Sequence, residues 1–466
     1  MKNQDPPREH LQSILNLFTN SKFQQALTNS NLMLEKFPNS VVLCNIAGAS
    51  NAGLRQFDAA IENYKQALKI KPDYAEAYYN MGIALKDKGN LEEAIESYIK
   101  ALKIKPDYAE AYYNMGNALK DKGNLEEAIE SYIKALKIKP DYAEAYNNMG
   151  IALKDKGNLE EAIESYIKAL KLKSDYIQAK ESLVSLLAGY SPQNDSKNII
   201  VKVNEKIRKI DINNNSKIIS DEQIVNLFSR SEDCISSFGL ELRTSKDQIF
   251  RGNTMNCERH LSVFDKHDAI PEYCFGCYKV QVEPRSIIEL IKLFIVFDQL
   301  ELNENNTRKC MIEFRPEISG YYKGLIYCYG LNQANQISDY LNIIIKQSIG
   351  IGLSSKVKRG CSQYAISYPD YKEINLSGPQ LMNYNEDWRV IENSHDKKTP
   401  LHVNEVKRVN LPGLSLNDIL IIRKWIDYAK GIGDSSADLL NQKSVYYPII
   451  HDRAKARIHS LHLTTL

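Results

Sequence analysis

The sequence predicts an α-solenoid followed by an α+β domain. The first observation is a row of prolines spaced 34 residues apart: Pro38, Pro72, Pro106 and Pro140. The second is an ordered series of strand-like and helix-like segments after residue 277. The third is the length, because 466 residues are too many for one compact core. We therefore expect a repeat array over residues 6–190, a linker over 191–217 and an α+β domain over 218–466.

Each 34-residue unit predicts two helices joined by a tight turn. In the unit that begins at Pro72, two apolar faces occur at helical spacing: Tyr78, Met81, Gly82 and Leu85, then Ala94, Tyr98 and Ala101. Gly89 lies between them and suits the left-handed end of a helix. Small residues such as Gly82 allow the two helices to approach closely, and the next proline ends the pair. One pair cannot bury its apolar face alone, so neighbouring units are expected to stack.

These positions carry a family resemblance. Residues 38–173 resemble tetratricopeptide repeats in register over four units, and residues 6–37 resemble a degenerate fifth unit. The resemblance implies a superhelix in which the first helix of each pair lines a groove. It also implies a platform that binds proteins or extended peptides and is not itself catalytic.

We expect an asparagine ladder in that groove. Asn80, Asn114 and Asn148 occupy the same inward position of three successive units. Each carboxamide has one acceptor and two donors, which can pair with the backbone of a peptide. The ladder is similar to that of the O-linked N-acetylglucosamine transferases, which holds extended peptide. The alternative is that asparagine is simply frequent at this position and faces water. Beside the ladder, three further residues are expected to bind peptide: Tyr79, Tyr113 and Asn117.

The segment from residue 277 to 368 predicts the element order βαββαβ. The expected elements are a strand at 278–282, a helix at 284–298, strands at 309–314 and 321–329, a helix at 332–347 and a strand at 356–368. That order is the plan of ferredoxin-like folds. We recognise no named family for residues 218–466, and the fold alone would not give a function.

Thiol and imidazole side chains gather just before that order. Cys257 and His260 form a C-x-x-H pair; after thirteen intervening residues, Cys274 and Cys277 form a C-x-x-C pair. Two-residue spacers let both ligands of a pair face one ion, and thiolates with imidazole suit tetrahedral zinc. Four protein ligands would close the site, so the sequence predicts a structural zinc ion at 257–277. The alternatives are ordinary thiols, an iron–sulfur cluster and a redox-active C-x-x-C pair.

Charge and apolar patterns argue against several partners. The 60 basic and 58 acidic residues leave a formal charge of +2, so nucleic acid is not an expected partner. The longest apolar stretch, residues 287–297, contains Glu289 and Lys292 and is too short to span a bilayer. No signal peptide is visible, and seven of the eight cysteines follow residue 230. We therefore expect a reducing, cytoplasmic location.

The sequence predicts an adaptor whose repeat groove binds an extended peptide or a partner protein, rather than an enzyme. Two other classes stay open for the C-terminal domain. It could be a transferase-like enzyme that modifies proteins recruited by the repeats. It could also bind RNA, because residues 323–330 distantly resemble the third strand of an RNA-recognition motif.

Overall fold

The structure is a computed structural model of the full chain. It describes residues 5–192, 196–210, 218–236, 242–253, 257–315, 318–361, 363–365, 367–375, 379–398, 411, 413–440 and 447–464. The chain divides into two compact units, Met1–Leu186 and Leu187–Leu466. Within the described residues, no helix combines the length and the apolar character that a membrane crossing requires.

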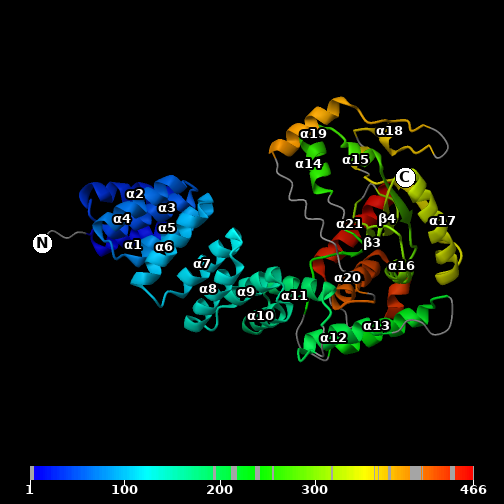
Figure 1. The fold of residues 1–466 in the computed structure, drawn as a ribbon, viewed down its shortest axis with the longest axis horizontal. Coiled ribbons are helices and arrows are strands. Elements are labelled where there is room, and N and C mark those ends of the chain that lie inside the picture. The colour runs from blue at the N-terminus through cyan, green and yellow to red at the C-terminus, as the bar shows by residue number, and fades with distance from the viewer. Residues whose placement is uncertain are drawn as a thin grey trace. The chain divides into compact units, whose positions relative to one another are not determined.

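The first unit contains the predicted α-solenoid. Five helix pairs follow one another along its described residues, and α11 (Ile177–Gly189) begins after the fifth (Figure 1). The pairs are α1 (Arg8–Thr19) with α2 (Phe23–Lys36), α3 (Val41–Gly53) with α4 (Phe57–Ile70), α5 (Ala75–Lys88) with α6 (Leu91–Ile104), α7 (Ala109–Lys122) with α8 (Leu125–Ile138), and α9 (Ala143–Lys156) with α10 (Leu159–Leu172).

Two kinds of glycine shape each pair. Gly89 ends α5 with a φ of +95°, a left-handed conformation that glycine adopts without a steric penalty. Gly82 instead makes room for a ring, because a Cβ at this position would lie 2.6 Å from the ring of Tyr98. The Tyr98 side chain is fully buried between the two helices. The same contact recurs one and two units later, at Gly116 with Tyr132 and at Gly150 with Tyr166.

The first helices form one continuous row. α3 contacts α5, α5 contacts α7, and α7 contacts α9, whereas each second helix packs mainly against the first helices on either side of it. In a curved stack, the row whose members lie closest together lines the inside of the curve. The first helices therefore present the inner surface of the array.

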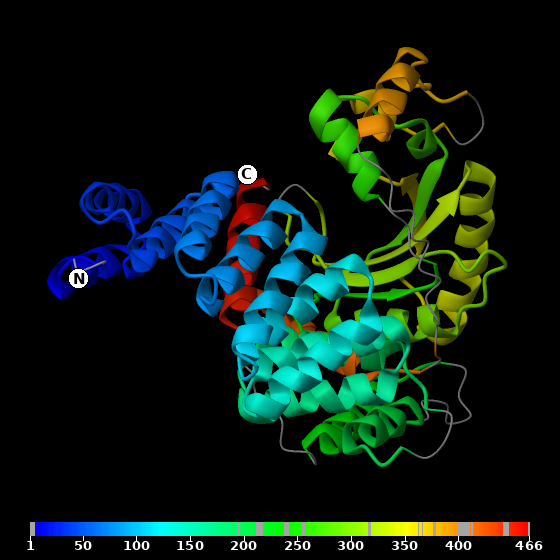
Figure 2. The same cartoon turned by 60° about the vertical axis from the view of Figure 1, so that its left-hand side comes forward.

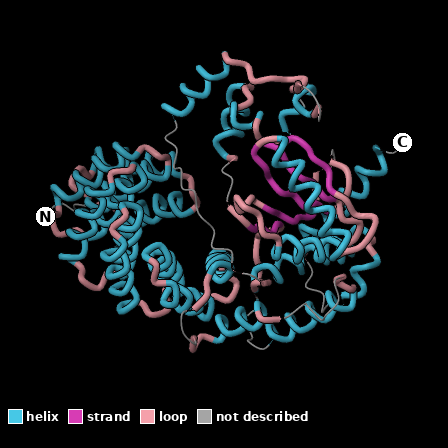
Figure 3. Tube along the Cα trace, turned by 45° about the vertical axis from the view of Figure 1, so that its right-hand side comes forward, coloured by secondary structure: helices cyan, strands magenta, loops and turns pink. Residues whose placement is uncertain are grey.

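The second unit is built around one five-stranded sheet. Its strands are β1 (Gln248–Arg251), β2 (Cys277–Val282), β3 (Arg308–Ile312), β4 (Tyr322–Tyr329) and β5 (Ser355–Arg359). Their spatial order is β1-β3-β4-β2-β5, and every neighbouring pair is antiparallel. Helices α16 (Ile287–Gln299) and α17 (Leu331–Ser348) contact each other and pack against the strands (Figures 2 and 3).

The strands and helices expected after residue 277 are present in the expected order, with two differences at the sheet edges. The last strand ends at Arg359, not at residue 368, because a 3-10 helix at Gln363–Ala365 places Tyr364 in a separate apolar cluster. Strand β1 was not expected, since four residues are too few to show an alternating pattern.

The remaining helices surround the sheet or form a small group at one end of it. Those around the sheet are α12 (Ile199–Arg208), α13 (Asp221–Ser236), α20 (Leu416–Ile432) and α21 (Pro448–Thr464). The small group consists of α14 (Glu258–His267), α15 (Glu272–Phe275), α18 (Pro369–Lys372) and α19 (Asp387–Lys398) (Figure 1). Helix α12 lies inside the stretch 191–217 that was expected to be a linker. It is ordered there because Val201, Val203 and Ile207 bury an apolar face.

Candidate functional site

The ladder asparagines lie on the inner row and bond the unit before them. Asn80 Nδ2 donates to Asn45 Oδ1 at 3.1 Å. Asn114 Nδ2 donates to the hydroxyl of Tyr79 at 3.0 Å, and Asn148 Nδ2 donates to the hydroxyl of Tyr113 at 3.0 Å. All three asparagines are half-buried. The predicted ladder is therefore also a line of hydrogen bonds that joins successive repeats.

The three rungs differ in how much hydrogen-bonding capacity remains. Asn148 donates a second bond to Asn117 Oδ1 at 2.9 Å and accepts one from Asn147 at 3.1 Å, so both of its donors are used. Asn114 accepts only a long bond of 3.4 Å from Asn117. At Asn80, one N–H and the Oδ1 atom have no partner among the described residues. The capacity to bond a ligand therefore lies at Asn80 and Asn114.

Asn117 is a connecting residue of the array. Its Oδ1 accepts hydrogen bonds from the Tyr132 hydroxyl at 2.8 Å and from Asn148, and its amide donates to Asn114. The equivalent residue one unit earlier is Ile83. There the buried Tyr98 hydroxyl has no partner in the described part of the chain. Asn117 thus links α7, α8 and α9, a role that its place in the groove did not suggest.

Aromatic rings flank the rungs. The ring of Tyr79 packs against that of Tyr108 with centroids 4.7 Å apart, and one unit later Tyr113 packs against Tyr142 at 4.8 Å. Burial, followed by the negative charge of Glu110, raises the pKa of Tyr79. Its hydroxyl therefore stays protonated at neutral pH. The inner surface around the rungs is neutral and aromatic, with carboxamides between the rings.

Two acids of the inner row are paired with lysines from the loop that follows the second helix of the same repeat. Glu110 lies 3.5 Å from Lys139, and Glu144 lies 3.6 Å from Lys173. These pairs are about half exposed, so each contributes little to stability. The lysines do offset the negative charge of these glutamates on the inner surface. A ligand is therefore not expected to be recognised there by its charge alone.

The predicted zinc ligands lie in the small helical group and at the start of β2. Cys257 precedes α14, and His260 lies on it with its ring stacked on Tyr273 at a centroid distance of 5.0 Å. Cys274 is buried, with Sγ 3.4 Å from the hydroxyl of Tyr364. In the parts of the chain that the structure describes, no three His, Cys, Asp or Glu side chains stand in an arrangement that could hold a metal ion. The zinc ion stays a prediction.

A fourth thiol joins this group without having been expected there. Cys361 follows β5 and lies near Cys257, Cys274 and Cys277, close enough for the charges of the thiols to interact. Its distance along the chain from Cys277 hides this from the sequence. The sequence shows a glycine directly before this cysteine, inside the predicted strand 356–368, which does not identify a partner.

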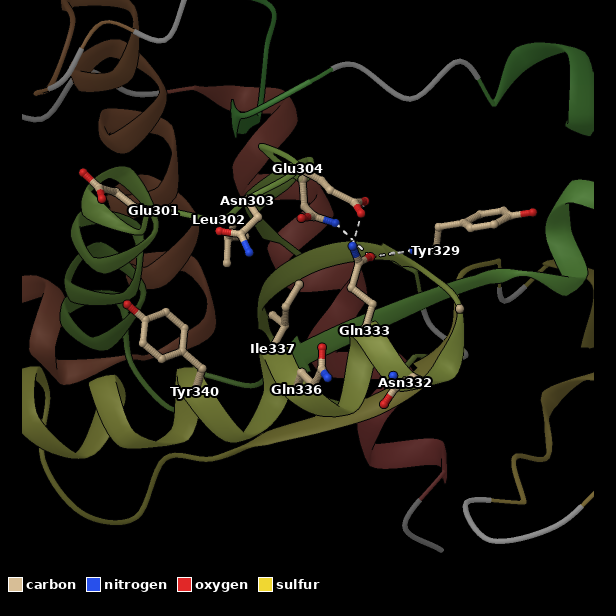
Figure 4. Close-up of a pocket in the computed structure, with 12 residues that line it drawn as sticks. Glu301, Leu302, Asn303, Glu304, Tyr329, Asn332, Gln333, Gln336, Ile337 and Tyr340 are labelled. Carbon is tan, nitrogen blue, oxygen red and sulfur yellow. Dashed lines mark hydrogen bonds between the residues drawn. The ribbon is translucent and has the colours of Figure 1, made fainter.

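The second unit also has an open polar pocket, of about 630 Å³, beside the start of α17 (Figure 4). In the figure, Gln333 stands between Glu304 and Tyr329; its amide donates to Glu304 at 2.7 Å, and it accepts from the Tyr329 backbone N–H at 2.8 Å. The pocket residues are Glu301, Leu302, Asn303, Glu304, Asn306, Tyr329, Gly330, Asn332, Gln333, Gln336, Ile337 and Tyr340. None of them is a cysteine, histidine or lysine. The pocket offers hydrogen bonds, carboxylates and tyrosine hydroxyls, but no thiol, imidazole or amine.

Two family profiles match the repeat region. One described as "TPR repeat" matches residues 55–89, 84–123 and 116–157. Another, described as "Tetratricopeptide repeat", matches residues 143–176. No family profile matches the C-terminal half.

A curated relative shares part of this sequence. Over 76 residues, the chain is 34% identical to a probable UDP-N-acetylglucosamine–peptide N-acetylglucosaminyltransferase SEC of Arabidopsis thaliana. The match covers 16% of this chain and 8% of that protein. Because the chain spans such a small part of the transferase, the match carries no activity over to it.

Several solved structures match about a third of this chain. A crystal structure of MamA is 30% identical and covers 34% of this chain and 92% of that chain, with a TM-score of 0.32. YrrB, described as a TPR protein with an unusual peptide-binding site, is 21% identical and covers 38% and 92% with a TM-score of 0.33. PilF of Pseudomonas aeruginosa is 18% identical and covers 38% and 81% with a TM-score of 0.36.

Proposed function

Because residues 55–176 are tetratricopeptide repeats, as their sequence predicts, we propose that the inner row binds an extended peptide segment of a partner protein. One observation carries the proposal: the carboxamides of Asn80 and Asn114 keep hydrogen-bonding groups unused on a surface of neutral tyrosine rings. A carboxamide presents the same donor and acceptor as a peptide group, so it can pair with a peptide backbone irrespective of side chains.

The three asparagines of the ladder have different roles in this proposal. Asn80 and Asn114 contact the peptide, whereas Asn148 has both donors engaged within the array and mainly joins repeats. The rings of Tyr79 and Tyr113 add apolar contact area on either side of the backbone. Backbone bonds with few charged contacts give binding that tolerates many peptide sequences.

The test compares two pairs of Asn→Ala substitutions in the same two repeats of the full chain. Asn80→Ala with Asn114→Ala removes the inner carboxamides. Asn90→Ala with Asn124→Ala is the matched control, because these residues lie at the start of second helices and bond Glu93 and Glu127. Binding of unstructured, uncharged peptides is measured by fluorescence anisotropy. We expect about a tenfold or larger loss of affinity in the first pair only, equivalent to one or two lost hydrogen bonds. Equal affinities of both pairs would exclude the proposed site.

For the C-terminal unit, we propose a ferredoxin-like core extended by one strand. The strand order β3-β4-β2-β5, with α16 and α17 in the crossover positions, supports this assignment, and β1 adds an edge next to β3. An experimental structure in which β2 does not lie between β4 and β5 would overturn it.

We also propose that the protein acts in a reducing compartment, the cytoplasm. All eight cysteines are free thiols in the structure, which fits such a compartment. Titration of unfolded, freshly purified protein should find eight reactive thiols in the absence of reductant. A stoichiometric loss of two would indicate a disulfide and contradict the proposal.

A further inference from the structure

The polar pocket beside α17 lies between two segments of the second unit (Figure 4). The chain that follows α16, residues 301–306, forms one side of it, and the first half of α17 forms the other. β4 ends at Tyr329 and α17 begins at Leu331, so the turn between them is the single residue Gly330, whose φ is +88°. Glycine adopts this positive φ without a steric penalty. The sheet therefore sets the position of the α17 side of the pocket.

Hydrogen bonds join the two sides of the pocket. Besides its bonds to Glu304 and to the Tyr329 backbone, the Gln333 carboxamide accepts a bond from Asn306 Nδ2 at 3.2 Å. Asn306 Nδ2 also donates to the carbonyl of Tyr327 on β4 at 2.9 Å. Asn306 and Gln333 thus connect the segment 301–306 to both β4 and α17. The walls are held in place without a ligand, as in most small-molecule sites.

Four polar side chains around this network have unused hydrogen-bonding groups: Glu301, Asn303, Asn332 and Gln336. None of them forms a hydrogen bond or an ion pair with a residue that the structure describes. All four are exposed, so each can exchange its bonds to water for bonds to a ligand. Together they offer one carboxylate, which only accepts hydrogen bonds, and three carboxamides, which both donate and accept.

The charge of the pocket restricts the class of ligand. None of the residues that line it is a lysine, an arginine or a histidine, and Glu301 and Glu304 add negative charge, so a phosphate or carboxylate ligand would be repelled. A metal ion is not favoured, because no three His, Cys, Asp or Glu side chains in the described parts of the chain are arranged to hold one. Of the described lining residues, only Leu302 and Ile337 are aliphatic, which is too few for a mainly apolar ligand. The pocket therefore suits a neutral ligand with many hydroxyl groups.

An aromatic ring adds a second kind of contact. Tyr340 lies at the end of the pocket opposite Gln333 (Figure 4) and is 47% exposed. The face of an aromatic ring carries partial negative charge, so it attracts the slightly positive hydrogens of C–H groups. A sugar ring presents C–H groups on its face and hydroxyls around its rim. Among neutral hydroxylated compounds, a sugar can therefore use both the ring and the carboxamides.

We propose that this pocket binds a neutral sugar. Its hydroxyls donate to Glu301 and exchange hydrogen bonds with the three unused carboxamides, while its C–H face packs on Tyr340. The volume of about 630 Å³ is typical of small-molecule sites, and the open side admits either a free sugar or the end unit of a longer chain. The inference does not depend on peptide binding by the repeats.

The test is saturation-transfer difference NMR on the full-length protein with glucose, galactose, mannose and the methyl glycoside of each. At least one of these sugars should receive saturation from the protein. A signal from a free sugar and its methyl glycoside alike would identify a pocket that accepts a linked sugar, and a signal from the free form alone would identify a free sugar as the ligand. No signal from any of the six probes would overturn the proposal, as would binding of spermidine or Ca²⁺ in their place, measured by calorimetry.

Two substitutions locate the bound sugar in the pocket. Gln336→Ala and Tyr340→Ala should each lower its affinity about tenfold, equivalent to one lost hydrogen bond or ring contact. The matched controls are Gln347→Ala on the same helix and Tyr273→Ala, because both residues are exposed outside the pocket. All four variants replace exposed side chains, so each is expected to fold. Equal affinities of the pocket and control variants would contradict the proposal.

Discussion

The hydroxyl of Tyr132 donates a 2.8 Å hydrogen bond to Asn117, whereas the equivalent hydroxyl of Tyr98 is buried and finds no partner among the residues that the structure describes. The two repeats are otherwise almost identical in sequence. Replacement of Asn117 by isoleucine, the residue found one unit earlier, should therefore leave the Tyr132 hydroxyl unsatisfied. We expect a loss of about 1–3 kcal/mol in unfolding free energy.

The reverse substitution is the control for this prediction. Ile83→Asn would offer an acceptor to Tyr98 while removing apolar area, so its effect should be smaller than that of Asn117→Ile. Urea unfolding of the full chain, followed by circular dichroism, gives both values. An unchanged midpoint in Asn117→Ile would show that the bond contributes nothing.

The close contact between Gly82 and Tyr98 leads to a prediction about packing inside one repeat. Gly82→Ala places a methyl group 2.6 Å from the ring of Tyr98, which is fully buried. Overpacking of this kind costs about 1–3 kcal/mol. In Gly89→Ala nothing lies within 4 Å of the new methyl group, and the effect comes only from the φ of +95°. Thermal unfolding should rank Gly82→Ala as the more destabilised variant, and the opposite order would refute the packing argument.

Asp418 makes the C-terminal unit sensitive to acid. Burial alone would raise its pKa, but the charge and hydrogen bonds of Arg251, 2.8 Å away, hold that pKa below its usual range. A lowered folded pKa adds stability that is fully present above the unfolded value of about 4 and is lost as the pH falls through the folded value. The unfolding free energy should therefore decrease below about pH 4.

Asp418→Asn isolates that contribution. Breaking one arm of the buried pair should cost about 3–5 kcal/mol at pH 7, because among the described residues Arg251 then keeps only Asp298 as an ion-pair partner. The substitution should also make the unfolding free energy depend less on pH below about pH 4. If wild type and Asp418→Asn lose stability equally between pH 5 and pH 2, another group controls the acid response.

We expect the first and last asparagines of the ladder to have different roles: Asn80 contributes mainly to peptide affinity, and Asn148 mainly to the stability of the array. Asn148→Ala removes two donated hydrogen bonds within the array and should lower the melting temperature with little direct effect on peptide affinity. Asn80→Ala removes one such bond and should mainly weaken peptide binding. Both quantities are measured on the same purified proteins. Identical profiles of the two variants would mean that the rungs are equivalent after all.

The array could be predicted from sequence because its information is local. The 34-residue period, the turn glycine and the Gly82–Tyr98 spacing each lie within one repeat. The use of the asparagine donors was not predictable in the same way. It depends on residues 31 and 35 positions away on the neighbouring helix, such as Asn117 and Tyr113 for Asn148.

In the C-terminal unit, too, contacts between residues far apart in the sequence could not be predicted. The alternating pattern of residues 278–282 and the apolar run of 287–297 were enough to predict a strand and a helix. Cys361 joins Cys277 only because β5 pairs with β2, and β5 is too short and too charged to fix that pairing in advance. His260, at the favoured spacing, turns toward Tyr273 because its ring gains stacking there.

The central claim, that peptides bind the inner row, is tested most directly by site-specific photo-crosslinking. A photoreactive phenylalanine replaces one isoleucine at a time: Ile83 and Ile151 on first helices, and Ile99 and Ile133 on second helices, where each is 41% exposed. The account predicts crosslinks to bound peptide from positions 83 and 151 and none from 99 and 133. Crosslinks from the second helices alone would place the binding surface on the outside of the array and contradict the account.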